Sequence, residues 1–266
     1  ITRASAKSMG HEMIHDREHS QYSLKEGYGA LLAHLMKDIK AEFRLSEPVR
    51  RIDFSADHVQ VFTDSGVYEA EKVLVTVPLP LLPSIEYIPA ISDKLHAATK
   101  IGFGSVIKVL IRFDHKWWGS IREKQFEKLF FMFSKEIIPT WWTQYPAEHA
   151  VLTGWVAGPN AHALRQKSEA EIISLGLESL SNIFTVDLAR LREMVVASRA
   201  FIWEVDPYAQ GGYSYPTPET ETAIEDIIAP VNDKLYFAGE ALWDEQCATV
   251  EGAFQSGRAA AARMMQ

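Results

Sequence analysis

The stretch LYFAGE at Leu235–Glu240, followed by TVEGAFQSGR at Thr249–Arg258, decides how the fold of this chain is interpreted. LYFA is a short apolar strand, and Gly239 ends it where the backbone turns sharply or passes close to another group. Thr249 is suited to cap a helix, and small or apolar residues recur after it with helical spacing. A helix start favours an anionic ligand group. The stretch predicts a strand, a tight loop and a helix that hold an electron-rich ring or a phosphate, or that simply close an α/β core.

The composition is that of a globular protein. The chain has 266 residues, 47% of them apolar, which allows one large domain or two small ones. Its net charge of -8 gives no electrostatic footprint for nucleic acid. No apolar run approaches the length of a membrane span, and the N-terminus lacks both a signal peptide's apolar core and an initiator Met, as a fragment would. The single cysteine, Cys247, favours a reducing compartment, so we expect a cytoplasmic location.

A helix followed by a β-meander is predicted in the first third of the chain. Glycines open the helix, which runs from residue 27 to about residue 40 with helical periodicity. Pro78 interrupts the last strand, so a crossover to another layer is expected there. The ranges expected as strands are 43–45, 49–54, 59–63, 67–70 and 72–77.

Residues 84–200 change in character and indicate a separate α+β domain. Strands are expected at 101–113, 129–133, 140–143 and 151–157, and a helix at 168–184. Tryptophans concentrate in this region, and we expect some to line a substrate cavity and more to lie in the core. They are Trp117, Trp118, Trp141, Trp142 and Trp155.

Lys108 is the one charged residue in the apolar run GFGSVIKVLI at 102–111. If Ile107 and Val109 face one side of a strand, Lys108 faces the other, where its ammonium meets an apolar layer unless it is paired or hydrated. The alternative is an edge strand whose lysine reaches solvent by its long stem.

Four segments resemble the flavin amine oxidases, the group that contains monoamine oxidases, polyamine oxidases and the lysine-specific histone demethylases. They are the C-terminal stretch, the run GYGALLAHL…PVRRIDFSADHVQVFTDSGVYEAEKVLVTVPLPLL, the "GFG…K" segment ending at Lys108, and WEVDPYAQGGYSY at Trp203–Tyr215. Together the resemblance covers residues 20–266, and it corresponds to the C-terminal portion of such an enzyme.

This resemblance implies a mixed fold with α/β and α+β parts. A partial FAD-binding domain, Rossmann-like and with a β-meander, would be interleaved with an α+β substrate-binding domain. Residues 1–26 would be a segment of the substrate domain or an irregular lead-in, and 27–83 a segment of the FAD-binding domain. Residues 84–200 would form the substrate-binding domain, and 201–266 would return to the FAD-binding domain.

The resemblance also implies roles for single residues. Lys108 would hold a water against flavin N5, and Tyr213 and Thr249 would face the substrate. Tyr213 stands where monoamine oxidases carry a cysteine bonded to the flavin, so FAD is expected to bind noncovalently. Ser214 and Thr249 replace the two cage tyrosines of monoamine oxidases, which leaves the substrate class open. The positions implied to bind FAD are Val49 (otherwise an ordinary core residue), Thr76, Pro78, Trp203, Gly239, Glu240, Thr249, Val250 and Ala253.

The activity implied is oxidation of a small-molecule amine. The α-carbon would lose a hydride to flavin N5, the imine would hydrolyse, and oxygen would reoxidise the flavin to give hydrogen peroxide. Two alternatives stay open: a related flavin desaturase or isomerase of the carotenoid or protoporphyrinogen type, and a catalytically inactive binding fragment.

One unit of the family is missing. The G-x-G-x-x-G βαβ unit that grips the FAD pyrophosphate occurs nowhere in the chain, so we expect a lost N-terminal segment or a separate chain to supply it. Gly102-x-Gly104 does not replace it, because Ile107 stands at the third glycine's place and a strand follows. Alone, residues 1–266 should bind FAD weakly or not at all.

No metal site is expected. HEMIH at His11–His15 matches the zinc-protease motif, but no convincing third ligand accompanies it. Cys247 lacks a basic partner nearby in sequence, so we interpret it as a packing residue.

Overall fold

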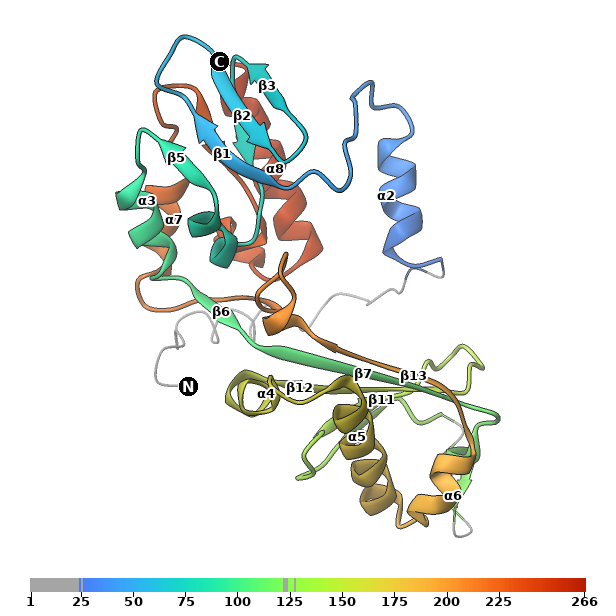
Figure 1. Cartoon of the computed structure of the whole chain (residues 1–266). Coiled ribbons are helices and arrows are strands. Elements are labelled where there is room, and N and C mark those ends of the chain that lie inside the picture. Colours follow the sequence, from blue (N-terminus) through green and yellow to red (C-terminus); the bar gives the residue numbers. More distant parts are fainter. Residues whose placement is uncertain (1–23, 25, 122–123, 127) are drawn as a thin grey trace.

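The structure, a computed structural model, describes residues 24, 26–121, 124–126 and 128–266. The chain forms two lobes, one above the other in Figure 1, and each has its own hydrophobic core. The first lobe contains residues 49–101 and 217–266, and the second contains residues 106–202. The expected mixture of an α/β part with an α+β part is confirmed.

The first lobe contains a four-stranded sheet in the order β3-β2-β1-β5. Its strands are β1 (Val49–Asp53), β2 (Val59–Thr63), β3 (Val67–Ala70) and β5 (Glu86–Ile88). The first three form the predicted antiparallel meander, and β5 joins β1 in parallel. The strand expected at 43–45 is wrong: Phe43 and Leu45 are 52% and 86% exposed in a loop, with no neighbouring strand to pair with.

A two-stranded parallel sheet joins two segments that are far apart in the sequence. It pairs β4 (Val73–Val75) with β15 (Leu235–Phe237). The expected strand at 72–77 is shorter, because Pro78 leads into the 3₁₀ helix η1 (Leu79–Ser84). Both strands contribute to the core of the first lobe, together with α3 (Ser92–Ala98) and α7 (Thr220–Ile228).

Two more helices flank this lobe. The predicted C-terminal helix is α8 (Val250–Met264), and Thr249 caps it by accepting a hydrogen bond from the Gly252 amide at 2.9 Å. The first helix, α2 (Tyr28–Met36), ends earlier than residue 40. It stands apart from the rest of the lobe in Figure 1 and buries none of its residues.

The second lobe contains a five-stranded antiparallel sheet in the order β10-β11-β12-β7-β13. Its strands are β7 (Val106–Phe113), β10 (Phe131–Phe133), β11 (Thr140–Trp142), β12 (Val151–Ala157) and β13 (Val195–Ile202). Lys108 therefore lies on an interior strand, β7, which pairs with β12 and β13, so the interpretation as an edge strand is wrong. Smaller elements are η2 (Trp117–Gly119), β8 (Ser120–Ile121) and β9 (Lys124–Gln125).

Among the described residues, helices cover one face of this sheet only. They are α4 (Gly158–Leu164), α5 (Glu169–Phe184) and α6 (Leu188–Glu193), and they lie on the side away from the first lobe in Figure 1. Ser168 and Glu171 form a capping box that starts α5, the helix expected at 168–184. Trp117, Trp118 and Trp141 are core residues, as expected for most of the tryptophans.

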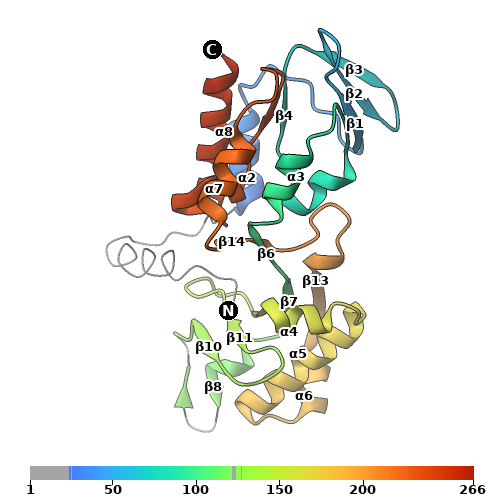
Figure 2. The same cartoon turned by 90° about the vertical axis from the view of Figure 1, so that its left-hand side faces the viewer.

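Two passages of the chain connect the lobes. β6 (Gly102–Gly104) continues into β7, and β13 leads through η3 (Trp203–Val205) to β14 (Tyr213–Tyr215), which pairs with β6 (Figure 2). The Ser105 hydroxyl donates to the Glu204 carboxylate and fastens the two passages together. Residues 85–101 pack in the first core. We therefore propose a lobe boundary near residue 102 in place of residue 84.

Candidate functional site

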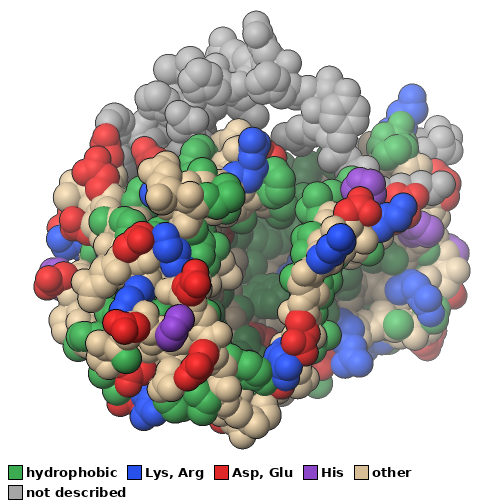
Figure 3. All heavy atoms as spheres, turned by 90° about the horizontal axis from the view of Figure 1, so that it is seen from above, with side chains coloured by type: hydrophobic (Ala, Val, Ile, Leu, Met, Phe, Trp, Pro, Cys, Tyr) green, Lys and Arg blue, Asp and Glu red, His purple; other side chains and the backbone are tan. Residues whose placement is uncertain are grey.

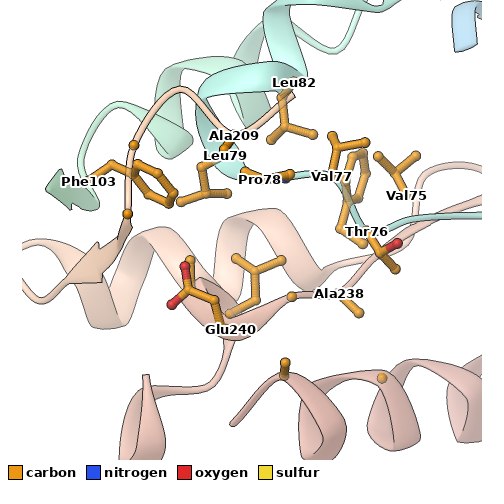
Figure 4. A pocket seen from close by; sticks show the side chains of 18 residues that line it. Val75, Thr76, Val77, Pro78, Leu79, Leu82, Phe103, Ala209, Ala238 and Glu240 are labelled. Atoms are coloured by element: carbon orange, nitrogen blue, oxygen red, sulfur yellow. The ribbon is translucent and has the colours of Figure 1, made fainter. Parts of the chain in front are cut away.

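A cavity of about 310 Å³ opens at the base of the first lobe. Figure 4 shows the segment from Val75 to Leu82 along one wall, and Ala238 and Glu240 along the other. Five positions expected to bind FAD line it: Thr76, Pro78, Gly239, Glu240 and Ala253. The wall is otherwise apolar, so Glu240 supplies its only carboxylate among the described residues. Seen from above, the centre of the molecule is hollowed and lined by hydrophobic side chains (Figure 3).

Several lining residues were not identified from the sequence. They come from η1, from β6 and from the loop before β14, and include Leu79, Leu82, Phe103, Ala209, Gly211 and Gly212. The PLPLL run after β4 carried a usable signal, because prolines that end a strand leave the apolar side chains that follow at the strand's end. Phe103 gave no such signal, since β6 is brought here only by its pairing with β14.

Glu240 organises the cavity wall. It begins the 3₁₀ helix η4 (Glu240–Leu242), and its carboxylate accepts from the Ser214 amide at 3.1 Å and the Ser214 hydroxyl at 2.6 Å. It also accepts from the Ala248 amide at 2.8 Å, in the loop that follows η5 (Asp244–Gln246). One carboxylate thus joins β14 to the loop before α8. Tyr213 and Thr249, the two residues expected to face the substrate, each adjoin a residue held by Glu240.

The start of α8 leaves backbone amides available. Gly252 and Ala253 donate to the side chain and the carbonyl of Thr249, respectively. Within the described part of the chain, the amides of Val250 and Glu251 make no hydrogen bond. Free amides at a helix start carry partial positive charge and favour an electron-rich group.

Gly239 and Gly257 keep the cavity open. A Cβ atom added at either position would meet no atom within 4 Å, so both border empty space. By contrast, a Cβ on Gly252 would lie 2.1 Å from the Gln246 carbonyl oxygen. Gly252 is therefore needed for packing, while Gly239 and Gly257 leave room for a ligand.

Lys108 lies on the face of the second sheet that carries no helices. Its neighbours Ile107 and Val109 are buried on the helix side, and Lys108 itself is half-buried. Its Nζ lies 5.6 Å from the centre of the Trp142 ring. It forms no ion pair with any described residue, so an aromatic face and not a carboxylate accompanies the charge. Lys108 does not line the cavity.

Tyr213 lies in β14 opposite Gly104, at the junction of the two lobes. Its side chain is 37% exposed, and burial of the rest raises the pKa of its hydroxyl above the ordinary value. It therefore stays protonated at neutral pH and offers an aromatic face with a hydroxyl donor.

The remaining predicted positions lie outside the cavity. Val49 begins β1 and packs partly against the core, which is also what an ordinary strand residue would do. Trp203 stacks on Phe201 with ring centres 6.0 Å apart. Val250 is exposed at the start of α8. The structure thus brings five of the predicted positions to one cavity and holds Tyr213, Thr249 and Val250 near its edge.

The zinc-protease motif at His11–His15 lies outside the described residues. Among the residues that are described, no group of three or more His, Cys, Asp or Glu side chains is arranged to hold a metal. Cys247 is half-buried beside η5, and it is not part of a disulfide. Across the same residues, none of the helices combines the length and the apolar character that crossing a membrane requires.

The chain is similar to lysine-specific histone demethylases in sequence and to a putrescine oxidase in fold. Human lysine-specific histone demethylase 2 is 28% identical over 97% of this chain, and lysine-specific histone demethylase 1 homolog 3 of Arabidopsis thaliana is 31% identical over 91% of it. The chain spans 32% and 15% of those two proteins. A solved putrescine oxidase variant matches the fold over 90% of this chain and 53% of its own, with a TM-score of 0.75 and 21% identity.

A family model matches nearly the whole chain. The model described as flavin containing amine oxidoreductase covers residues 3–265. The four motif segments, the mixed two-lobe fold and the cavity beneath α8 are all in keeping with that match. The chain therefore belongs to the flavin-containing amine oxidoreductases.

Proposed function

We propose that this chain forms the substrate lobe and the flavin-facing wall of an enzyme that oxidises an amine with noncovalently bound FAD. The single observation that carries the proposal is the Glu240 carboxylate, which holds Ser214 and Ala248 and so fixes the neighbouring Tyr213 and Thr249 at one cavity edge. Family membership supports the reaction class.

The residues present fit part of the FAD molecule. The free amides of Val250 and Glu251 suit the electron-rich pyrimidine end of a flavin, and the empty space at Gly239 suits close approach of a ring or its ribityl chain. No glycine-rich turn before a helix offers a pyrophosphate cradle in the described chain. A cavity of about 310 Å³ is also small for a complete dinucleotide.

Bound FAD would supply a two-electron acceptor, which takes a hydride from the amine α-carbon and passes both electrons to oxygen as hydrogen peroxide, while water hydrolyses the imine to a carbonyl compound and an amine or ammonia. Lys108 would hold a water at the sheet face beside the ring. Tyr213 would place its aromatic face against the amine. Thr249, whose hydroxyl caps α8 and donates to the Gln246 carbonyl, would face the substrate at the start of that helix.

A further α/β unit is needed to complete this site. In the described chain, β4 pairs only with β15, although parallel sheets are normally larger and covered on both faces. Helix α2 and the loop after it also expose large apolar side chains, which marks a surface that another unit covers. They are Tyr28, Leu32, Leu35, Met36, Ile39 and Phe43. We propose that an FAD-binding segment, on the same chain or on another, packs here.

Peroxide release tests the proposal. Flavin-loaded full-length protein should release peroxide with at least one member of a panel of monoamines, polyamines, amino acids and a methylated-lysine peptide. A preparation limited to residues 1–266 should be colourless near the flavin absorption bands. Failure to oxidise any amine would remove the oxidase proposal, and a yellow, stoichiometric preparation of residues 1–266 would remove the need for a further unit. The expected cytoplasmic location stays a prediction.

A further inference from the structure

The face of the second sheet opposite α4–α6 carries an aromatic surface around Lys108. Strand register places Trp155 of β12 and Phe201 of β13 directly beside Lys108, one on each side. Directly paired residues point to the same face of a sheet, so these three side chains form one row. The row faces the first lobe, because α4–α6 occupy the opposite face (Figure 1).

The rings continue from this row in two directions. Trp142 lies beside Lys108 on the next row, and its ring centre is 5.9 Å from that of Phe131. Toward the cavity, Phe201 stacks on Trp203 with planes inclined by 17°. We call these five residues, Phe131, Trp142, Trp155, Phe201 and Trp203, the aromatic face.

All charged residues in the strands of this sheet are positive. The five strands contain no Asp or Glu, but they contain Lys108, Arg112 and Arg199. Arg199 lies 3.5 Å from Glu169 at the sheet edge. Lys108 and Arg112 have no carboxylate partner in the described chain. A second cation brought to this face would therefore meet like charges that no carboxylate of the described chain pairs with.

Two carboxylates near the lobe junction are already engaged. Glu204 accepts from Ser105, and its carboxylate lies 2.8 Å from His162 Nδ1 and 3.6 Å from Arg165 Nε. Glu240 accepts three hydrogen bonds from Ser214 and Ala248. Neither carboxylate is free to receive a distant ammonium group of a substrate.

We infer that this site takes a monoamine whose arm is apolar or aromatic and carries no second positive charge. The rings supply apolar contact area, and the unpaired cations disfavour polyamines and basic peptides. The inference names the substrate class of the amine oxidation proposed above and rests on it. It selects among amines, whereas family membership alone does not.

A matched pair of substrates isolates the second charge. Pentylamine and 1,5-diaminopentane share a five-carbon chain and differ by one terminal ammonium group. With the flavin-loaded full-length protein, kcat/KM for pentylamine should exceed that for the diamine by about tenfold or more. Intrinsic tryptophan fluorescence should respond to pentylamine at lower concentrations than to the diamine, which reports binding without turnover.

Thr140 offers a test on the protein side. It lies beside Trp155 in the same row of the sheet, one strand further from Lys108. Thr140→Glu should raise kcat/KM for the diamine relative to pentylamine by about tenfold, because it adds the missing carboxylate. Thr140→Gln, of nearly the same shape and without charge, should leave that ratio unchanged.

The outcomes separate the two proposals. Equal or faster oxidation of the diamine, or of a basic peptide carrying methylated lysine, would overturn the inference while leaving the amine oxidase intact. If Thr140→Glu and Thr140→Gln changed the ratio of kcat/KM for the diamine to kcat/KM for pentylamine equally, the inference would also be overturned. The added charge would then not be the cause of the change. Absence of peroxide with every amine would remove both proposals together.

Discussion

Ser214 donates both its backbone amide and its hydroxyl to the two carboxylate oxygens of Glu240, at 3.1 and 2.6 Å. The pair links β14, which follows the second lobe, to the wall of the cavity in the first lobe. Because the Ser214 side chain is buried, its donors have no water to replace a lost acceptor. The geometry of the candidate site therefore depends on one ionised side chain.

Glu240→Gln tests this dependence. The amide group keeps one acceptor but turns a donor toward groups that also donate, so we expect the free energy of unfolding to fall by about 2 kcal/mol. The flavin content of the full-length protein should fall as well. Chemical denaturation and the flavin absorbance measure these two effects. Glu251→Gln is the control, because Glu251 bonds only to Gln255 on the exposed side of α8; equal losses in both variants would contradict the role of Glu240.

Gly239→Ala separates ligand binding from folding. Its Cβ would meet no atom within 4 Å, so the melting temperature should not fall, but the methyl group would occupy ligand space. We expect flavin affinity to weaken by about tenfold. Gly252→Ala should do the reverse and lower stability by about 2 kcal/mol, because its Cβ would overlap the Gln246 carbonyl. Thermal unfolding and flavin titration of both variants provide the comparison.

Lys108→Met should slow reoxidation of the reduced flavin by about a hundredfold, since a positive charge near the developing peroxide is lost. Methionine keeps the length and the apolar stem, so the sheet should be undisturbed. Arg112→Met, on the same strand and the same face, is the matched control. Stopped-flow mixing of reduced enzyme with oxygen would contradict the assignment if Lys108→Met reoxidised as fast as the unaltered protein.

Tyr87→Phe should stabilise the first lobe. The Tyr87 side chain is buried in β5, and burial without a hydrogen-bond partner for its hydroxyl raises the pKa of that group well above its ordinary value. Removing the hydroxyl should raise the free energy of unfolding by about 1 kcal/mol. Tyr236→Phe should lower it, because the Tyr236 hydroxyl donates to Asp233. Urea denaturation of both variants measures these changes in the free energy of unfolding. A fall for Tyr87→Phe would mean that the Tyr87 hydroxyl is hydrogen-bonded in the folded protein.

Asp233 gives the first lobe a pH-dependent contact. The Tyr236 hydroxyl, followed by the Lys72 ammonium, lowers the pKa of the Asp233 carboxyl below its ordinary value. Because the folded pKa is the lower one, the stabilisation is complete above the unfolded pKa near 4 and disappears as pH falls through the folded value. Asp233→Asn should melt at a lower temperature than the unaltered protein at pH 7, and the gap should close toward pH 3. If the difference in melting temperature stayed constant between pH 7 and pH 3, ionisation of Asp233 would not be its cause.

Local patterns in the sequence predict the elements that depend on local chemistry. Thr249 was expected to cap a helix, and it does, because its hydroxyl reaches an amide three residues away. The strand expected at 43–45 failed because apolar residues alone do not provide a neighbouring strand. The partners of Glu240 could not be predicted, since Ser214 lies 26 residues earlier and meets it only after β14 has paired with β6. The position of Lys108 on an interior strand likewise depends on β13, whose pairing with β7 is nonlocal.

The parallel pairing of Val73 with Leu235 dictates an order of assembly. The second lobe is one continuous segment, so it can form its antiparallel sheet as soon as β13 has been synthesised. Strand β4 must wait with exposed apolar surface until β15 and α8 have been synthesised. Without β15 and the residues that follow it, the first lobe would lack part of its core while the second lobe would be unaffected. Protease digestion of nascent chains should therefore find residues 106–202 protected before the first lobe.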